Sequence, residues 1–217
     1  MVVTLASDNA HFEKVTAEMS RRKLLLTGFG PFGQHAVNHS WLAVKEVADH
    51  EFAFWEIIAK EIAVDYNFVN NNVPQLWNEV NPDLVIHVGI SSYEKGVVHL
   101  ETCAHSSGYI REDINGCCPK IAGNIECSKN VCLETTIDVD CIVNNLSDSF
   151  PVVCKSNNAG RYLCEFIYYT SLNMHRAPTL FIHIPTLDED VTLEKIVSTL
   201  INIVQLCMVQ VPFAKCL

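Results

Sequence analysis

The sequence has 217 residues, of which 49% are hydrophobic, so it suits one compact domain with a sizeable core better than two domains. Acidic residues outnumber basic residues by 25 to 15, and basic residues gather only at positions 21–23, which excludes the clustered cations that nucleic-acid binding needs. No run of about 18 apolar residues occurs, so we expect no membrane-spanning helix and no membrane partner.

Residues 1–21 show no clear hydrophobic period and predict a mobile extension ahead of a single domain over residues 22–217. The N-terminus carries Asp8, Glu13 and Glu18 and lacks the cationic-then-apolar order of a secretory signal. We therefore expect a cytoplasmic protein, and in that compartment the ten cysteines are expected to be reduced thiols.

From residue 23 onward, strand-like and helix-like segments alternate. In chain order, the sequence predicts a strand over residues 23–27, a helix over 40–49, a strand over 52–59, a helix over 65–79, strands over 84–91 and 97–103, a helix over 138–146, a strand over 151–156, a helix over 160–175, a strand over 179–184 and a helix over 191–210. Between the strand over residues 97–103 and the helix over residues 138–146, residues 106–130 lack any periodicity and predict a long surface loop. This order predicts an α/β fold: a single three-layer α/β/α sandwich with a mostly parallel mixed sheet and helices on both faces.

The glycine-rich stretch GFGPFG, residues 28–33, matches the dinucleotide-binding pattern G-x-G-x-x-G directly after a predicted strand. In a dinucleotide site the helix opens inside the pattern, so that its N-terminus meets the pyrophosphate. Here Pro31 removes one N–H donor, and the first helix starts later, after the N-cap candidates Asn38 and Ser40. The sequence therefore disfavours a nicotinamide-dependent oxidoreductase, and we expect no cofactor.

Phe29 and Phe32 lie three residues apart on this turn, just past the end of a strand. One interpretation is that the two rings form an apolar wall of a binding pocket. The other is that they only pack against the end of the sheet, because phenylalanine is more often a core residue than a site residue. The residue types leave both interpretations open.

Cys164 is the best candidate for a nucleophile, because catalytic groups in open α/β sheets gather beyond the carboxyl ends of strands. It lies early in the predicted helix over residues 160–175 and follows the strand over 151–156. Helical side chains lean toward the helix N-terminus, so we expect its sulfur above Gly160. The positive end of the helix favours a thiolate if Cys164 lies in the first turn.

His183 is the candidate base, since it lies near the end of a predicted strand that Pro185 closes. From there it would approach Cys164 at a neighbouring strand end, as a thiol–imidazole pair requires. Glu101, on the predicted strand over residues 97–103, is the candidate that orients the imidazole. The alternatives are a buried cysteine, a core histidine and a solvated carboxylate on an edge strand.

Several possible metal ligands crowd the predicted irregular region: Cys103, His105, Cys117, Cys118, Cys127 and Cys132. A zinc site usually shows a C-x-x-C pair, and none occurs here. The adjacent pair Cys117 and Cys118 also fits one tetrahedral site poorly. We therefore expect free thiols and no metal.

Seven stretches of the sequence resemble one family, pyroglutamyl-peptidase I, the cytosolic cysteine peptidases that remove an N-terminal pyroglutamate. They are TGFGPFG with VNHSW, LVIHVGIS, LETCAHSSGY, TIDVD, NAGRYLCEFIYYTSL and FIHIP, and the resemblance covers most of residues 23 to about 190. The segment AGRYLCEFIYYTSL is far more specific than any three-residue pattern.

The resemblance implies an omega-peptidase whose substrates are N-terminally pyroglutamylated peptides and whose intermediate is a thioester acyl-enzyme. By the same resemblance, Cys164 is the nucleophile, His183 the general base and Glu101 the carboxylate of the triad, while Phe29 and Phe32 belong to the lactam pocket. A catalytically inactive homologue that binds pyroglutamyl peptides is the alternative. The presence of all three triad residues disfavours it.

Overall fold

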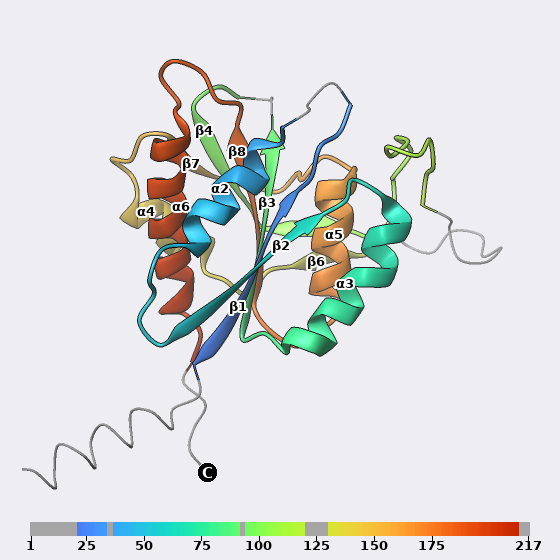
Figure 1. The fold of residues 1–217 in the computed structure, drawn as a ribbon, viewed down its shortest axis with the longest axis horizontal. Helices are drawn as coiled ribbons and strands as arrows, with labels where there is room; N and C mark the ends of the chain where they lie inside the picture. Colours follow the sequence, from blue (N-terminus) through green and yellow to red (C-terminus); the bar gives the residue numbers. More distant parts are fainter. Residues whose placement is uncertain (1–20, 34–36, 92–93, 120–129, 213–217) are drawn as a thin grey trace, which may run out of the picture.

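The computed structural model describes residues 21–33, 37–91, 94–119 and 130–212 (Figure 1). The predicted extension over residues 1–21 therefore lies outside the described residues, except for Arg21. In chain order, the elements are β1 (Arg22–Phe29), α2 (His39–Ala48), β2 (Trp55–Ile62), α3 (Tyr66–Val80), β3 (Leu84–Ser91), β4 (Val97–Glu101), β5 (Cys103–His105), β6 (Cys132–Glu134), α4 (Val139–Asn145), β7 (Val152–Ser156), α5 (Leu163–Leu172), β8 (Thr179–Pro185) and α6 (Leu193–Met208).

Six strands form one sheet in the order β2-β1-β3-β8-β4-β7. Strands β2, β1, β3 and β8 run parallel to one another, so their carboxyl ends meet at one edge. Strand β4 runs antiparallel to β8 and parallel to β7. The predicted mostly parallel mixed sheet is confirmed.

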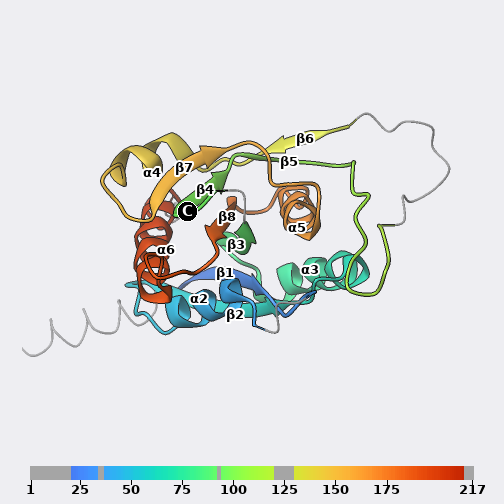
Figure 2. The same cartoon turned by 90° about the horizontal axis from the view of Figure 1, so that it is seen from above.

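Helices cover both faces of this sheet. Helices α2, α4 and α6 lie on one side, and α3 and α5 lie on the other (Figures 1 and 2). Each side has its own buried apolar cluster, because neighbouring residues of a strand point to opposite faces: Leu24 and Leu26 belong to one cluster, and Leu25 belongs to the other. The predicted three-layer sandwich is confirmed. Within the described ranges, every helix is too short or too polar to span a bilayer.

The start of α2 lies where the sequence predicts it. Asn38 is the N-cap, and its side chain accepts a hydrogen bond from the Ser40 N–H. Gly28, the first glycine of the G-x-G-x-x-G match, lets the end of β1 approach this turn closely. A Cβ atom at position 28 would lie only 2.7 Å from the Trp41 Cα atom. This glycine therefore serves packing between a strand and a helix.

Several element boundaries differ from the sequence prediction. The strand predicted over residues 52–59 is β2, which covers Trp55–Ile62. Two other differences lie next to the site. The predicted strand over residues 97–103 breaks at Thr102, whose N–H still donates to the Ser156 carbonyl oxygen as the last bond of the β4–β7 ladder. The chain then leaves the main sheet, and β5 pairs with β6 in a separate two-stranded sheet that the sequence did not predict. Helix α5 begins at Leu163, later than predicted, because Gly160 and Arg161 adopt left-handed conformations with φ of 93° and 49°.

A fully buried histidine, His87, ties several elements together beneath the carboxyl-end edge. Its Nδ1 atom lies 2.7 Å from the Thr27 hydroxyl oxygen, and its Nε2 atom lies 2.8 Å from the Ser171 hydroxyl oxygen. Trp77 donates its indole N–H to the same Ser171 oxygen. Burial lowers the pKa of His87 to about 3, so the ring is neutral at physiological pH.

This buried neutral ring predicts a specific acid sensitivity. The folded-state pKa lies below the ordinary 6.5, so the stability that His87 contributes is present above pH 6.5 and is lost as the pH falls toward 3. Between these values, His87 alone should lower the free energy of unfolding by about 1.4 kcal/mol per pH unit. The free energy of unfolding, measured with urea for wild type and His87→Gln between pH 7 and pH 5, should fall less steeply with decreasing pH in the variant.

Equal slopes in the two proteins would contradict this assignment. A direct titration of the His87 ring by NMR provides a second measurement that does not depend on the stability of the variant. The ring resonance should stay unchanged down to pH 5, whereas a transition near pH 6.5 would show that the ring is not held neutral.

Candidate active site

A cavity of about 240 Å³ opens at the carboxyl-end edge of the main sheet. Its lining comes mainly from the end of β1 and the loop after it, the ends of β3 and β8, and the first turn of α5, together with Val64 and Arg111. The side chains that matter for its chemistry are Phe29, Phe32, Arg111, Cys164 and His183. The structure therefore brings four of the five predicted site residues to one cavity, and the fifth, Glu101, lies directly behind His183.

Cys164 is the second residue of α5 and follows the N-cap residue Tyr162 by two positions. It thus lies in the first helical turn, where the partial positive charge of the helix favours an anion. Tyr162 provides no side-chain cap, so the backbone N–H groups of this turn have no partner from the N-cap side chain. This arrangement supplies both a nucleophile and donors for a developing negative charge.

The sulfur of Cys164 rests against the backbone of Gly89 in β3. A Cβ atom at position 89 would lie 2.9 Å from this sulfur and 2.8 Å from the Phe181 ring. Only glycine leaves room there for the thiol in its present position. The direction of helical side chains predicts this space above Gly160 instead. Gly160 lines the cavity beside Cys164, but the close contact is with Gly89.

His183 and Glu101 meet across the β8–β4 pair. His183 Nδ1 lies 2.8 Å from Glu101 Oε1, and the two side chains are 7% and 1% exposed. Burial by itself lowers the pKa of His183, but the Cys164 thiolate and the Glu101 carboxylate outweigh it and raise that pKa to about 9. The imidazole is therefore positively charged at neutral pH, and it lies between the Cys164 sulfur and the Glu101 carboxyl group.

Glu101 depends on this histidine for its stability in the interior. Its second carboxylate oxygen is buried and has no hydrogen-bond partner among the described residues. The Tyr168 hydroxyl donates to the backbone oxygen of Glu101 and fixes the main chain there. A buried carboxylate with one unpaired oxygen is costly unless a cation lies beside it, and His183 is that cation.

A second carboxylate, Glu165, holds the turn that precedes Cys164. Glu165 is fully buried, and it accepts hydrogen bonds from the Arg161 backbone N–H at 2.7 Å and from the Arg161 guanidinium. It also accepts the His105 backbone N–H at 2.9 Å. These contacts stabilise Arg161 in its left-handed conformation and so fix where α5 begins.

The glycine-rich loop is not arranged as a phosphate cradle. The Phe29 N–H donates to the Ser40 hydroxyl oxygen at 3.0 Å, and the Gly30 N–H donates to the Ile62 carbonyl oxygen at 2.9 Å. Since Pro31 has no N–H, the central donors of the loop are absent or already used. The loop presents the rings of Phe29 and Phe32 to the cavity instead.

Sequence reasoning missed several residues that shape the site, namely Gly89, Arg111, Tyr162 and Glu165. Gly89 lies inside a predicted buried strand, where an isolated glycine signals a close approach by another group. That signal was available in the sequence. Arg111 lies over the Tyr162 ring, with its guanidinium carbon 4.3 Å from the ring centroid, and nothing in the local sequence pattern indicates this contact.

Comparisons with known proteins agree with this site. A family model described as pyroglutamyl peptidase matches residues 22–210. The chain is similar to pyroglutamyl-peptidase 1 of Rattus norvegicus, with 39% identity over 173 residues that cover 78% of this chain and 82% of the rat protein. It is 38% identical to pyroglutamyl-peptidase 1 of Homo sapiens over the same shares of the two chains.

A solved structure shows the same fold. The crystal structure of pyroglutamyl peptidase I from Bacillus amyloliquefaciens matches with a TM-score of 0.75. The match covers 89% of this chain and 100% of the other, at 23% sequence identity. The predicted α/β architecture therefore has a close experimental counterpart.

The contact between Gly89 and Cys164 can be tested by adding one methyl group. Gly89→Ala should displace the sulfur from its present position and lower kcat/KM by about 100-fold, since a displacement of about 1 Å at a reacting group has an effect of this size. The rate of alkylation of Cys164 by iodoacetamide should fall as well.

Gly30→Ala is the matched control, because the nearest atom to its new methyl group would be the end of the flexible Glu61 side chain, at 3.1 Å. This control should keep most of the activity. An unchanged rate in a folded Gly89→Ala protein would show that the position of the thiol does not depend on Gly89.

Proposed function

Because the chain belongs to the pyroglutamyl peptidase family, a family of cysteine peptidases, we propose that it removes N-terminal pyroglutamate from peptides with Cys164 as nucleophile, His183 as acid and base, and Glu101 as the orienting carboxylate. The observation that carries the proposal is the position of His183, which lines the cavity beside Cys164 and contacts Glu101 through Nδ1. A thiolate beside an imidazolium is the reactive form of a cysteine peptidase site.

In the first half of the reaction, the Cys164 sulfur attacks the pyroglutamyl carbonyl carbon. The carbonyl oxygen becomes an oxyanion, and first-turn N–H groups of α5 stabilise it. His183 then donates its proton to the leaving nitrogen as the carbon–nitrogen bond breaks, which leaves a thioester.

In the second half, the neutral His183 takes a proton from water, and the hydroxide formed attacks the thioester. The carbon–sulfur bond breaks, pyroglutamate leaves as a carboxylic acid, and the sulfur returns to its thiolate form. Glu101 holds the imidazole through Nδ1 in both steps and stabilises its charged form.

The character of the cavity supports a neutral five-membered ring as the group that is recognised. Phe29, Phe32 and Ile90 contribute apolar walls, and none of the described residues that line the cavity is acidic. A site for an ordinary peptide N-terminus would need an anionic partner for the charged amine. The lactam of pyroglutamate carries no charge and needs apolar contact with a few hydrogen bonds.

We also propose a cytoplasmic location. The mechanism needs a reduced Cys164, and the described cysteines are all free thiols. A reducing compartment preserves that state.

Removal of the nucleophile is the first test of this function. Cys164→Ser should lower turnover of pyroglutamyl-aminomethylcoumarin by at least about 10³-fold. A serine hydroxyl is a poor nucleophile unless a base is positioned to activate it, and His183 is positioned for a thiol. The matched control is Cys154→Ser, which also removes a half-buried cysteine but lies on β7, away from the cavity.

The control should retain its activity, and circular dichroism should show that both variants are folded. Full activity in Cys164→Ser would refute the proposed nucleophile. Binding of pyroglutamate without turnover by the unmodified protein would indicate an inactive homologue.

The role of Glu101 predicts a shift in the pH profile. The raised pKa of His183 means that the imidazolium persists below about pH 9 and is lost above it, so kcat/KM should fall on the alkaline side near pH 9. Glu101→Gln removes one anionic partner, so it should move this limb to lower pH and reduce kcat by about 100-fold. The loss should be smaller than for Cys164→Ser.

If the role of Glu101 were purely structural, Glu101→Gln would reduce the amount of folded protein but would not move the alkaline limb of the kcat/KM profile. A pH profile of Glu101→Gln that overlays the wild-type profile would therefore contradict the assigned role.

A further inference from the structure

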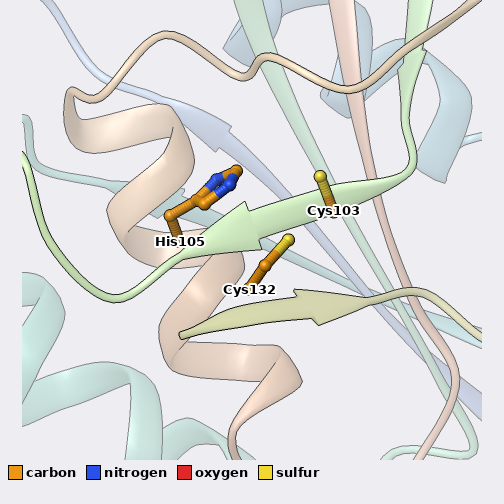
Figure 3. A group of neighbouring side chains, drawn as sticks. All are labelled: Cys103, His105 and Cys132. Atoms are coloured by element: carbon orange, nitrogen blue, oxygen red, sulfur yellow. The ribbon is translucent and has the colours of Figure 1, made fainter. Parts of the chain in front are cut away.

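A second group of reactive side chains lies on the small β5–β6 sheet, outside the cavity. Residues His105 and Cys132 are directly opposite each other in the antiparallel register. Cys103 lies two positions before His105 on β5, so alternation along the strand puts Cys103 and His105 on one face. Figure 3 shows these three side chains close together, with Cys132 reaching from β6 toward β5.

The three ligating atoms, two sulfurs and one ring nitrogen, lie within 4.8 Å of one another. Two thiolates bound to one tetrahedral zinc ion at about 2.3 Å are separated by roughly 3.8 Å, so only a small adjustment would bring these atoms to bonding positions. Two cysteines and one histidine form a ligand set that suits zinc, whereas calcium and magnesium prefer oxygen ligands.

A disulfide fits this geometry less well. Cys103 and Cys132 are diagonal neighbours in the register, because Cys103 is opposite Glu134. Diagonal residues of an antiparallel pair are about 7–8 Å apart, beyond the usual Cα separation of about 4.4–6.8 Å across a disulfide. An ion between the two sulfurs bridges the larger distance without moving the strands.

The histidine is already held as metal-bound histidines are. His105 Nδ1 lies 2.8 Å from Glu165 Oε1, and Glu165 is fully buried. A carboxylate that accepts one imidazole N–H fixes the ring and leaves the other nitrogen for the metal. This contact is independent of the sulfur positions, and it leaves Nε2 as the nitrogen that would bind an ion.

We propose that Cys103, His105 and Cys132 bind one zinc-class divalent ion, with solvent in the fourth position. Cys132 is exposed and gives the ion a path from solvent, while Cys103 is buried. Metal ligation by cysteine takes the thiolate form, so binding of the ion releases protons from the two sulfurs.

The site links the β5–β6 sheet to the base of the helix that carries Cys164. The connection runs from His105 to Glu165, which also holds Arg161 in the turn before α5. The missing C-x-x-C pair does not argue against this site, because the antiparallel register replaces the usual sequence spacing.

The test uses the full-length chain with Cys164→Ser, which removes the reactive thiol as a competing ligand. Under anaerobic conditions the protein is titrated with Co²⁺, which reports thiolate ligands by near-ultraviolet charge transfer and tetrahedral geometry by its visible bands. We expect one Co²⁺ per chain, displaced by one equivalent of Zn²⁺. Adding Cys132→Ser should weaken binding at least about tenfold and remove about half of the charge-transfer intensity.

Two matched controls remove an exposed cysteine elsewhere: Cys141→Ser on α4 and Cys118→Ser. Both should bind Co²⁺ as the Cys164→Ser protein does. The proposal is overturned by an absence of thiolate charge transfer, by an unchanged spectrum in the Cys132→Ser protein, or by an equal loss in either control.

X-ray absorption of the zinc-loaded Cys164→Ser protein gives a measurement that needs no further variant. We expect a shell of two sulfur atoms and one imidazole nitrogen, completed by a light atom from solvent. A shell of four sulfurs, or one without sulfur, would overturn the assignment.

Discussion

His183 and Glu101 form a charged pair that is withdrawn from water at the edge of the sheet. Such a pair is stable only if each charge has a partner close by, since isolated buried charges are very costly. The mixed strand directions of the sheet place the two charged groups next to each other. Because β4 runs antiparallel to β8, Glu101 lies opposite Phe181, diagonal to His183, and reaches the imidazole from the neighbouring strand. The cysteine then completes the arrangement from the helix on one face.

The position of the nucleophile depends on two further constraints of the fold. Gly89 gives the sulfur room against β3, and the left-handed turn at Gly160 and Arg161 sets the start of α5 so that Cys164 lies in its first turn. Glu165, directly after the nucleophile, holds that turn through Arg161. Each constraint acts on the backbone, so the geometry around Cys164 is largely set before substrate binds.

Much of this structure follows from local sequence patterns. Apolar periodicity predicts the main strands and helices, Asn38 identifies the start of α2, and the placement of Cys164 and His183 after neighbouring strands predicts their meeting. The β5–β6 sheet and the later start of α5 do not follow. The β5–β6 sheet depends on pairing between distant residues, such as Cys103 with Glu134. The start of α5 depends on the left-handed turn at Gly160 and Arg161, and neither feature leaves a periodic signal. For the same reason, the grouping of Cys103, His105 and Cys132 emerges only from the strand register.

The charge state of His183 is the claim on which the proposed chemistry depends, and ¹⁵N NMR of the imidazole measures it directly. Labelled protein should show both ring nitrogens protonated at pH 7, with loss of the proton near pH 9. Alkylation of Cys164 should lower that transition, because it removes one of the anionic partners. A neutral ring at pH 7 in the unmodified protein would contradict the ion pair, and with it the proposed mechanism.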